Sequence, residues 1–313
     1  MKRVTILFDD YGKNNKLPFS DNPKYKEHYE LLYQIGRELG VEFSRARLDW
    51  LRGGKVKKAW KQQKDEWVLD KKPFTPDAVW FKAKDTPAAR KKLAEIYTQL
   101  PVVSNPHLYE IVPNKYTMYV LFPTLFPKTF LVHNRYDLAK YLPKIKGRRA
   151  VLKPTVGSGG NGITIASKAV LKKTPITTAM LLQEFKESIA GIPGIMTGRH
   201  DLRVHVLNNK ILYAYYRKPK AGSLLANIAQ GGSMVLIKND EIPRAVKKMV
   251  EKVITTLQDL TPNFYSVDFL FDAAGHPWVI ELNRSPGIFF PPEYRAAETR
   301  LFKKIVRELF MKS

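Results

Sequence analysis

The sequence contains no cysteine among its 313 residues, which excludes disulfide bonds, thiolate zinc sites and cysteine nucleophiles. It also lacks any apolar run near the roughly 18 residues that a bilayer-spanning helix needs. Its start, MKRVTILFDD, reaches acidic residues too early for a secretory signal peptide. We therefore expect a cytoplasmic protein without a membrane span, in which oxygen or imidazole groups hold any metal ion.

Acidic residues are scarce, since 29 Asp and Glu stand against 53 Lys and Arg and leave a net charge of +24. The densest basic stretch runs from Arg45 to Lys64 and includes Trp50 and Trp60. Cations with interleaved aromatic rings would suit nucleic acid, but no recognition motif accompanies them. A solvated basic loop or helix is the favoured interpretation. The surplus charge would also draw in an acidic substrate.

The chain is long enough for two or more domains. In its first third, short apolar runs at 3–9, 41–46 and 77–83 alternate with a helix-period segment at 23–40. This alternation predicts a small parallel α/β domain. The rest of the chain shows short helices, strands and two hairpin-like units, a pattern typical of mixed, largely antiparallel α+β structure.

A glycine-rich segment, KPTVGSGGNGI, follows a predicted strand that ends at Lys153. Glycine permits positive φ and lets backbone N–H groups approach an anion closely. A P-loop would need its lysine after the glycines, and a dinucleotide fingerprint would need a helix directly after them. Here the lysine comes first and ITIAS favours a second strand. The segment is predicted to be a flap over phosphate, with a turn that binds nothing as the alternative.

A second motif, VDFLFDAAGHPWVIELN, is predicted to form a hairpin. Its four-residue turn would pair Phe271 with Trp278. The same register pairs Asp268 with Glu281 and places Asn283 on their face. Facing carboxylates repel each other, and two carboxylates with one amide suit Mg²⁺. The alternative is an acidic pair that faces solvent.

The order of these motifs resembles that of the ATP-grasp superfamily. Lys153 with GSGGNG is followed by MLLQEF, DLRV, NIAQGG and VDFLFDAAGHPWVIELNRSPG. The similarity covers residues 114–310 and is nearest to ribosomal-protein glutamate ligases and glutathione synthetases, with spore-coat-associated ATP-grasp proteins also similar. It implies an α+β ATP-grasp fold in which two subdomains clasp the nucleotide. The implied boundaries are 1–112 for the N-terminal α/β domain, 113–190 for the central subdomain with the flap, and 191–313 for the C-terminal subdomain.

The resemblance also implies a role for each matching residue. The metal ligands would be Asp268, Glu281 and Asn283, holding Mg²⁺ or, in its place, Mn²⁺. The catalytic cations would be Lys153, Arg203 and Arg217. The contacts to ATP would come from Lys115, Lys153, Ser158, Gly159, Gly160, Asn161, Gly162, Gln183, Glu184, Phe185, Lys186, Glu187 and Asn227.

Simpler roles remain open for several of these residues. Lys115 would also fit an ordinary surface lysine, and Glu187 a solvated turn residue. Arg203 lies between apolar neighbours on a strand, where an unpaired guanidinium is costly, so we expect an anionic partner. His200 and His205 are expected to be structural.

These parts predict an ATP-dependent carboxylate–amine ligase. It would form an amide or peptide bond through an acyl phosphate and release ADP and phosphate. Its partners would be small-molecule or peptide carboxylates and amines. Two other classes stay open: a noncatalytic ATP-binding protein of the spore-coat type, and a nucleic-acid-binding module.

Overall fold

The computed structural model describes residues 1–9, 18–19, 25–64, 66–103, 105–157, 160–219, 233–288 and 290–311. The chain divides into two compact units. Among the described residues, no helix is long and apolar enough to cross a membrane. The first unit comprises 1–110, 259–264 and 285–313, and the second comprises 111–258 and 265–284.

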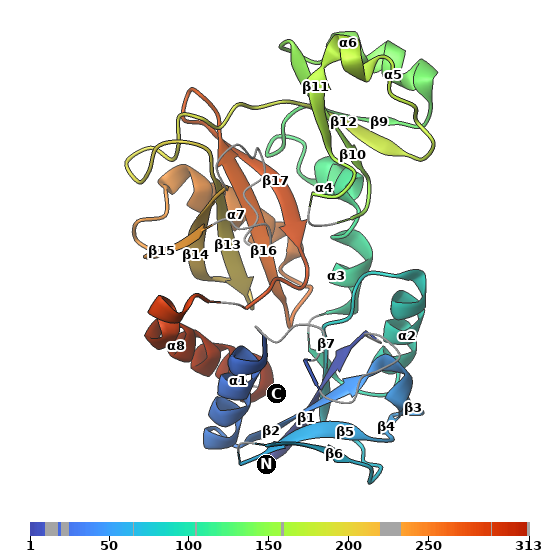
Figure 1. Cartoon of the computed structure of the whole chain (residues 1–313), viewed down its shortest axis with the longest axis vertical. Helices are drawn as coiled ribbons and strands as arrows, with labels where there is room; N and C mark the ends of the chain where they lie inside the picture. Colours follow the sequence, from blue (N-terminus) through green and yellow to red (C-terminus); the bar gives the residue numbers. More distant parts are fainter. Residues whose placement is uncertain are drawn as a thin grey trace. The chain divides into compact units, whose positions relative to one another are not determined.

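The first unit is built on a six-stranded sheet in the order β6-β5-β2-β1-β7-β8 (Figure 1). The parallel pairs of β1 with β2 and β7, and of β7 with β8, agree with the alternation in the sequence. β5 and β6 extend this sheet in antiparallel fashion, which the sequence does not predict. The strands are β1 (Lys2–Phe8), β2 (Val41–Arg47), β5 (Ala59–Gln63), β6 (Glu66–Asp70), β7 (Ala78–Phe81) and β8 (Val102–Val103).

Two helices from opposite ends of the chain lie side by side in the first unit (Figure 1). α1 (Lys26–Glu38) is followed by Gly40, whose φ of 81° lies in the left-handed region that favours glycine. α8 (Arg295–Val306) contacts α1 through the buried pair His28 and Glu298. The remaining helical segments are α2 (Pro87–Tyr97), α3 (Pro106–Ile111), 3₁₀ turns at Leu48–Trp50 and Pro292–Tyr294, and a π turn at Arg307–Met311.

The basic stretch from Arg45 to Lys64 is mostly β structure, so its interpretation as a loop or helix is wrong. Leu51 and Val56 are fully buried and face each other across a two-stranded hairpin. Arg52 and Lys55, the other pair, are exposed. Burial of the apolar side of the hairpin fixes its conformation and leaves its cations in water. The hairpin strands are β3 (Leu51–Arg52) and β4 (Lys55–Val56).

The second unit contains a four-stranded antiparallel sheet in the order β11-β10-β12-β9. Leu138 of α5 and Leu171 of α6 pack against Leu152 and Leu182 of this sheet. β10 runs directly into the glycine-rich segment. The elements are α4 (Lys115–Leu121), β9 (Thr129–Val132), α5 (Arg135–Tyr141), a 3₁₀ turn (Leu142–Lys144), β10 (Arg149–Pro154), β11 (Thr164–Ser167), α6 (Lys168–Leu171) and β12 (Met180–Glu184).

The same unit holds a five-stranded sheet in the order β15-β14-β13-β16-β17, with α7 against one face (Figure 1). α7 buries Val246, Val250 and Val253 along one side. Asn208 and Asn209 form the predicted turn between β13 and β14 with positive φ. The elements are β13 (Asp201–Leu207), β14 (Lys210–Lys218), β15 (Ser233–Ile237), α7 (Arg244–Leu257), β16 (Phe264–Phe271) and β17 (Pro277–Asn283).

Candidate active site

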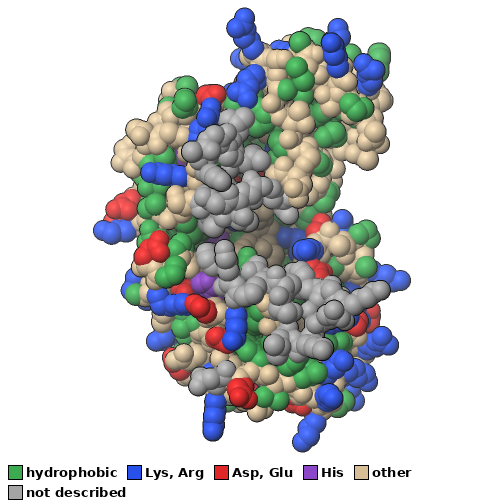
Figure 2. Space-filling model, viewed as in Figure 1, with side chains coloured by type: hydrophobic (Ala, Val, Ile, Leu, Met, Phe, Trp, Pro, Cys, Tyr) green, Lys and Arg blue, Asp and Glu red, His purple; other side chains and the backbone are tan. Residues whose placement is uncertain are grey.

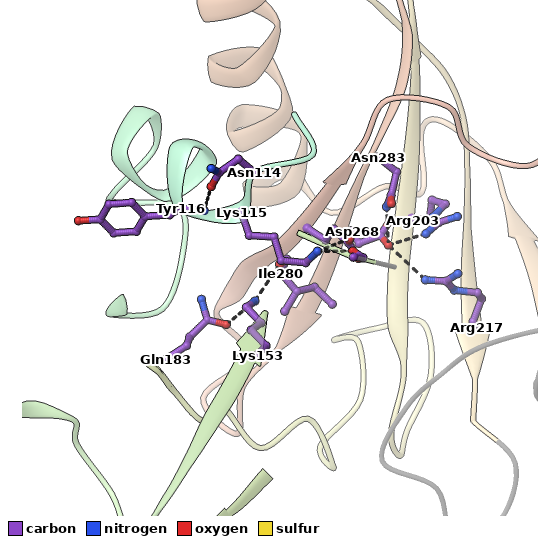
Figure 3. Close-up of polar contacts among 12 residues, drawn as sticks. Asn114, Lys115, Tyr116, Lys153, Gln183, Arg203, Arg217, Asp268, Ile280 and Asn283 are labelled. Carbon is purple, nitrogen blue, oxygen red and sulfur yellow. Dashed lines mark hydrogen bonds and ion pairs between the residues drawn. The ribbon is translucent and has the colours of Figure 1, made fainter. Parts of the chain in front are cut away.

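The hairpin of β16 and β17 places two carboxylates opposite each other. Asp268 pairs with Glu281, as the sequence predicts. Asn283 joins them, because its Nδ2 donates to Asp268 Oδ2 at 3.2 Å (Figure 3). Asp268 is only 3% exposed, so it does not belong to an acidic pair that faces solvent.

A β-bulge accounts for the one part of this hairpin that the sequence mispredicts. Phe271 pairs with Pro277 and not with Trp278. The register then shifts by one residue between Asp268 and Phe269, which leaves Ile280 without an opposite residue. The bulge restores the predicted pairing of the carboxylates and turns the backbone of β17 locally.

Two arginines on the neighbouring hairpin bind Asp268 (Figure 3). Arg203 Nε and Nη2 donate to Asp268 Oδ1 and Oδ2 at 2.7 and 2.6 Å. Arg217 donates to both oxygens of Asp201 at 2.6 and 2.5 Å, and its Nη2 lies 3.3 Å from Asp268 Oδ2. The expectation that Arg203 has an anionic partner is confirmed.

These guanidinium groups keep Asp268 ionised. Burial by itself would raise the pKa of Asp268, because water no longer solvates its charge. Arg203 and Arg217 outweigh that effect and hold the pKa of the carboxyl below its ordinary value. Asp268 is therefore a fixed negative charge in the interior at neutral pH.

Lys153, near the end of β10, is buried and has uncharged hydrogen-bond partners. Its Nζ donates to Gln183 Oε1 at 2.9 Å and to the carbonyl of the bulged Ile280 at 3.4 Å (Figure 3). Burial lowers the pKa of Lys153 to about 8. The charge of Glu281 raises this pKa by a smaller amount, and the charge of Lys115 lowers it further. Since these two partners are neutral, the hydrogen bonds orient the ammonium without cancelling its charge.

Lys115 connects three parts of the unit. It opens α4, which Asn114 caps by accepting from two backbone N–H groups at 3.0 and 3.2 Å. Its Nζ lies 3.2 Å from Glu281 Oε1 and also donates to the carbonyl of Gly157. Its backbone N–H donates to the carbonyl of Thr155 at 2.8 Å. With a side chain only 12% exposed, Lys115 is not an ordinary surface lysine.

The charges of this network nearly balance. Among the described residues, the network contains three carboxylates and four cations, so its net charge is one positive charge. Such an excess in a poorly solvated setting attracts an anion. The carboxylates are Asp201, Asp268 and Glu281, and the cations are Lys115, Lys153, Arg203 and Arg217.

The described part of the glycine-rich loop uses glycine for its conformation. Gly160 and Gly162 have φ of 80° and 74°. A Cβ at Gly162 would also lie 2.8 Å from Pro154 Cγ, which is too close. Asn161 between them is exposed. Three predicted nucleotide contacts lie outside the described residues: Ser158, Gly159 and Asn227.

Glu184, the last residue of β12, and Lys186 beyond it were predicted to contact the nucleotide and form a separate group of contacts. Glu184 Oε1 lies 2.7 Å from Lys186 Nζ, which in turn lies 4.4 Å from the centre of the Trp278 ring system. The Glu184 N–H donates to the carbonyl of Lys128 at 2.8 Å. This end of β12 therefore contacts the residue before β9 through Glu184 and β17 through Lys186.

Glu187 and Phe185 both contact the guanidinium of Arg149. Glu187 lies between Arg149 and Arg199, at 3.8 and 3.5 Å. The Arg149 guanidinium also lies 4.4 Å from the centre of the Phe185 ring. Glu187 is thus an ion-paired residue at the end of this segment rather than an isolated turn carboxylate.

The two histidines near Arg203 have structural contacts, as predicted. His200 Nε2 accepts from the backbone N–H of Phe271 at 3.2 Å, and its Nδ1 faces the carbonyl of Gly198 at 3.1 Å. Burial lowers the pKa of His200, so the ring is neutral. The buried His205 ring stacks on Tyr213, with centres 4.1 Å apart.

Two polar residues beside the predicted ones, Asp201 and Thr129, were not predicted from the sequence. Asp201 lies opposite Arg217 and holds it, while Thr129 lies opposite Gln183. The alternation of Asp201, Arg203 and His205 along one strand is a signal that favours a polar face. Thr129 carries no comparable signal, because threonine is common in strands.

A four-stranded antiparallel sheet that leads into a glycine-rich loop and a five-stranded sheet that carries paired carboxylates are the architecture of the ATP-grasp class. The chain belongs to the family with a RimK-like ATP-grasp domain, whose model matches residues 119–308. This membership confirms the superfamily and the α+β ATP-grasp fold that the sequence predicts.

Curated relatives carry the name probable alpha-L-glutamate ligase. The protein of Thioalkalivibrio sulfidiphilus is 30% identical over 168 residues, which cover 52% of this chain and 51% of the relative. That of Vibrio parahaemolyticus is 28% identical over 168 residues with the same coverage. The chain therefore spans about half the length of the curated relatives it matches.

Solved structures of similar fold match nearly the whole chain. D-alanyl-alanine synthetase A from Vibrio cholerae has a TM-score of 0.67 at 12% identity and covers 99% of both chains. A RiPP-associated ATP-grasp ligase from Chryseobacterium gregarium, solved with ADP and a leader and core peptide, has a TM-score of 0.66 at 14% identity and covers 100% of this chain and 98% of its own. Identities this low establish the fold alone.

Proposed function

We propose that this chain is an ATP-dependent carboxylate–amine ligase that forms an amide bond and releases ADP and phosphate. One observation carries the proposal: Asp268, Glu281 and Asn283 share a face next to the buried ammonium of Lys153. Membership in the RimK-like family and relatives named as ligases support the reaction class.

The chemistry needs charge stabilisation and no nucleophilic side chain. A carboxylate is a poor acyl donor because oxide would have to leave. Transfer of the γ-phosphoryl group of ATP gives an acyl phosphate, from which an amine displaces phosphate. Charge in that transfer is spread over the phosphoryl oxygens, so fixed cations stabilise it. We assign Lys115 and Lys153 to the ATP phosphates, and Arg203 and Arg217 to the transferred group and the substrate carboxylate.

Asp268, Glu281 and Asn283 fit a Mg²⁺ ion, for which Mn²⁺ would substitute. Their oxygen atoms belong to adjacent strands and one face, and the carboxylates are held together by the cations around them. Hard oxygen donors in small number are what Mg²⁺ prefers, with phosphate oxygens and water completing its shell. A bound ion would neutralise phosphate charge during the transfer.

An acidic amino acid or acidic peptide is the substrate we propose to test first. The relatives carry the name probable alpha-L-glutamate ligase, the network has one positive charge in excess, and the chain carries a net charge of +24. All three favour an anionic partner.

The test is phosphate release from ATP in the presence of single amino acids and acidic peptides. Release should require a carboxylate–amine pair, and Glu281→Gln should lower it by about 10²-fold or more. Glu42→Gln is the matched control, since Glu42 also pairs with a lysine, Lys61, at 3.2 Å, and should leave the rate unchanged. Nucleotide binding without release for any pair tested would point to a noncatalytic ATP-binding protein.

A further inference from the structure

A buried chain of hydrogen bonds runs from the carbonyl of Pro127, two residues before β9, to the ammonium of Lys153. Thr129 Oγ1 donates to the carbonyl of Pro127 at 2.8 Å. Gln183 Nε2 donates to Thr129 Oγ1 at 2.8 Å. Lys153 Nζ donates to Gln183 Oε1 at 2.9 Å. Each link is of ordinary hydrogen-bond length.

The direction of this chain follows from its first link. A carbonyl only accepts, so the Thr129 hydroxyl must donate to Pro127. Its oxygen is then an acceptor for the NH₂ group of Gln183. With its NH₂ group committed to Thr129, the Gln183 amide presents its oxygen to Lys153. The hydroxyl on β9 therefore sets which end of the amide faces the ammonium.

The strands place the three side chains on one face of the sheet. Thr129 is directly opposite Gln183 in the pairing of β9 with β12. Val151 is opposite Gln183 in the pairing of β10 with β12, so Lys153 is its diagonal neighbour. The register of the four-stranded sheet thus builds the chain.

Burial makes the links hard to replace. Thr129 and Gln183 are each 3% exposed, and Lys153 is 5% exposed. At such burial water does not readily replace a lost partner, and a buried donor without an acceptor costs more than a surface one. Both polar ends of the Gln183 side chain are used by Lys153 and Thr129.

We propose that Thr129 and Gln183 are positioning residues, which hold the Lys153 ammonium in place while leaving its charge uncompensated. This inference rests on the proposed function, because it assumes that Lys153 acts on the ATP phosphates. An amide oxygen orients the ammonium as a carboxylate would, but it carries no net charge. The amide therefore does not neutralise the Lys153 ammonium, whose charge is available to an anionic ligand.

Thr129→Val tests the first link, because valine keeps the shape and removes the hydroxyl. The freed amide can turn its NH₂ group toward Lys153, where two donors would face each other. We expect kcat to fall roughly tenfold, the scale of one buried hydrogen bond, while the KM for the amine acceptor stays the same. Thr129→Ser restores the hydroxyl and should recover most of kcat.

A control and a double variant separate positioning from packing. Thr5→Val removes another buried threonine hydroxyl, which contacts Ser44 Oγ at 2.9 Å, and should leave kcat unchanged. In a Lys153→Met background, Thr129→Val should cost nothing further, because its effect passes through the ammonium. A tenfold loss that persists there, or equal kcat in the Val and Ser variants, would overturn the proposal.

Gln183→Glu tests the claim about charge. Glutamate still offers an acceptor oxygen to Lys153, but its negative charge neutralises the ammonium. We therefore expect weaker ATP binding and a lower kcat. Unchanged ATP affinity would mean that the neutral amide has no such role.

Acylation of Lys153 by acetic anhydride, measured by mass spectrometry, needs no turnover. Loss of its acceptor in Thr129→Val should favour the neutral amine and raise the acylation rate by about threefold, or half a pKa unit. Lys168 in the same protein serves as the internal reference. Faster labelling without any ATP turnover by the wild type would refute the proposed function and leave the positioning role intact. An unchanged labelling rate in an active enzyme would refute the positioning role alone.

Discussion

Two arginine–aspartate pairs with the same two-pronged geometry lie in opposite environments. In the basic stretch, Arg47 Nε and Nη2 donate to Asp49 at 2.9 and 3.1 Å, and the aspartate side chain is 52% exposed. In the candidate site, Arg203 donates to Asp268 at 2.7 and 2.6 Å, and that aspartate side chain is 4% exposed. Burial, more than bonding pattern, separates the two pairs.

The two pairs differ in how strongly water compensates their charges. An exposed pair gains little, because water and salt screen it. A buried pair has lost its hydration, so removing one partner leaves an uncompensated charge. Figure 2 shows Lys and Arg side chains projecting all around the visible face. Most of the net charge on this face is therefore exposed, whereas the charges of the candidate site are few and nearly balanced.

The largest expected effect comes from neutralising the two aspartates in turn. Asp268→Asn leaves Arg203 without its charged partner in the interior, and should lower the free energy of unfolding by about 3 kcal/mol and abolish turnover. Asp49→Asn should change the free energy of unfolding by less than about 0.5 kcal/mol. Urea titration of both variants gives the two values. Similar losses in both would show that burial does not distinguish the pairs.

Lys153→Met should lower kcat by about 10²-fold, because a preorganised donor to the phosphoryl group is lost. The matched control is Lys168→Met, which removes the first lysine of α6, a residue that donates to the carbonyl of Ile145. Steady-state turnover at saturating ATP measures both. If the two variants behaved alike, Lys153 would have no special role in catalysis.

The pH dependence of kcat/KM for ATP should follow the ammonium of Lys153. Burial lowers its pKa to about 8 in the free protein, and the charged form is the one that binds phosphate. We therefore expect kcat/KM to fall as pH rises through about 8, since the proton is lost. Lys153→Arg keeps its charge and should remove this decline. A profile that stays flat to pH 10 in the wild type would contradict the assignment.

The smallest effect is expected in the basic stretch. Replacing Lys55, Lys57 and Lys58 by Glu reverses cations that act at long range, over a Debye length of about 8 Å. The kcat should survive, while kcat/KM for an acidic substrate should fall and lose its salt dependence. A neutral substrate is the control. Equal losses for both substrates would mean that the stretch supports the fold.

Much of the fold follows from periodicity in the sequence. The buried apolar runs predict the parallel strands of the first unit, because such strands are covered on both faces. Turn residues predict the hairpins, as at Asn208 and Asn209. The pairing of Asp268 with Glu281 agrees with the prediction only because the bulge after Asp268 offsets a turn register that differs by one residue from the predicted one.

Two β-bulges set strand registers that could not be predicted from the sequence. One lies between Asp268 and Phe269, and the other between His205 and Val206. Without the second bulge, Arg217 would not face Asp201. A bulge depends on how the sheet packs around it and has no reliable signal in the sequence. The Thr129 link to Lys153 is likewise set by strand order, which brings distant segments together.

The most direct test of the central claim follows an oxygen atom. The carboxylate substrate that supports phosphate release is labelled with ¹⁸O in its reacting carboxyl group and supplied with ATP and its amine partner. If the carboxylate is activated by phosphoryl transfer, an ¹⁸O atom must leave with the phosphate, and mass spectrometry will find it there. Amide formation with phosphate that carries no ¹⁸O would contradict the account.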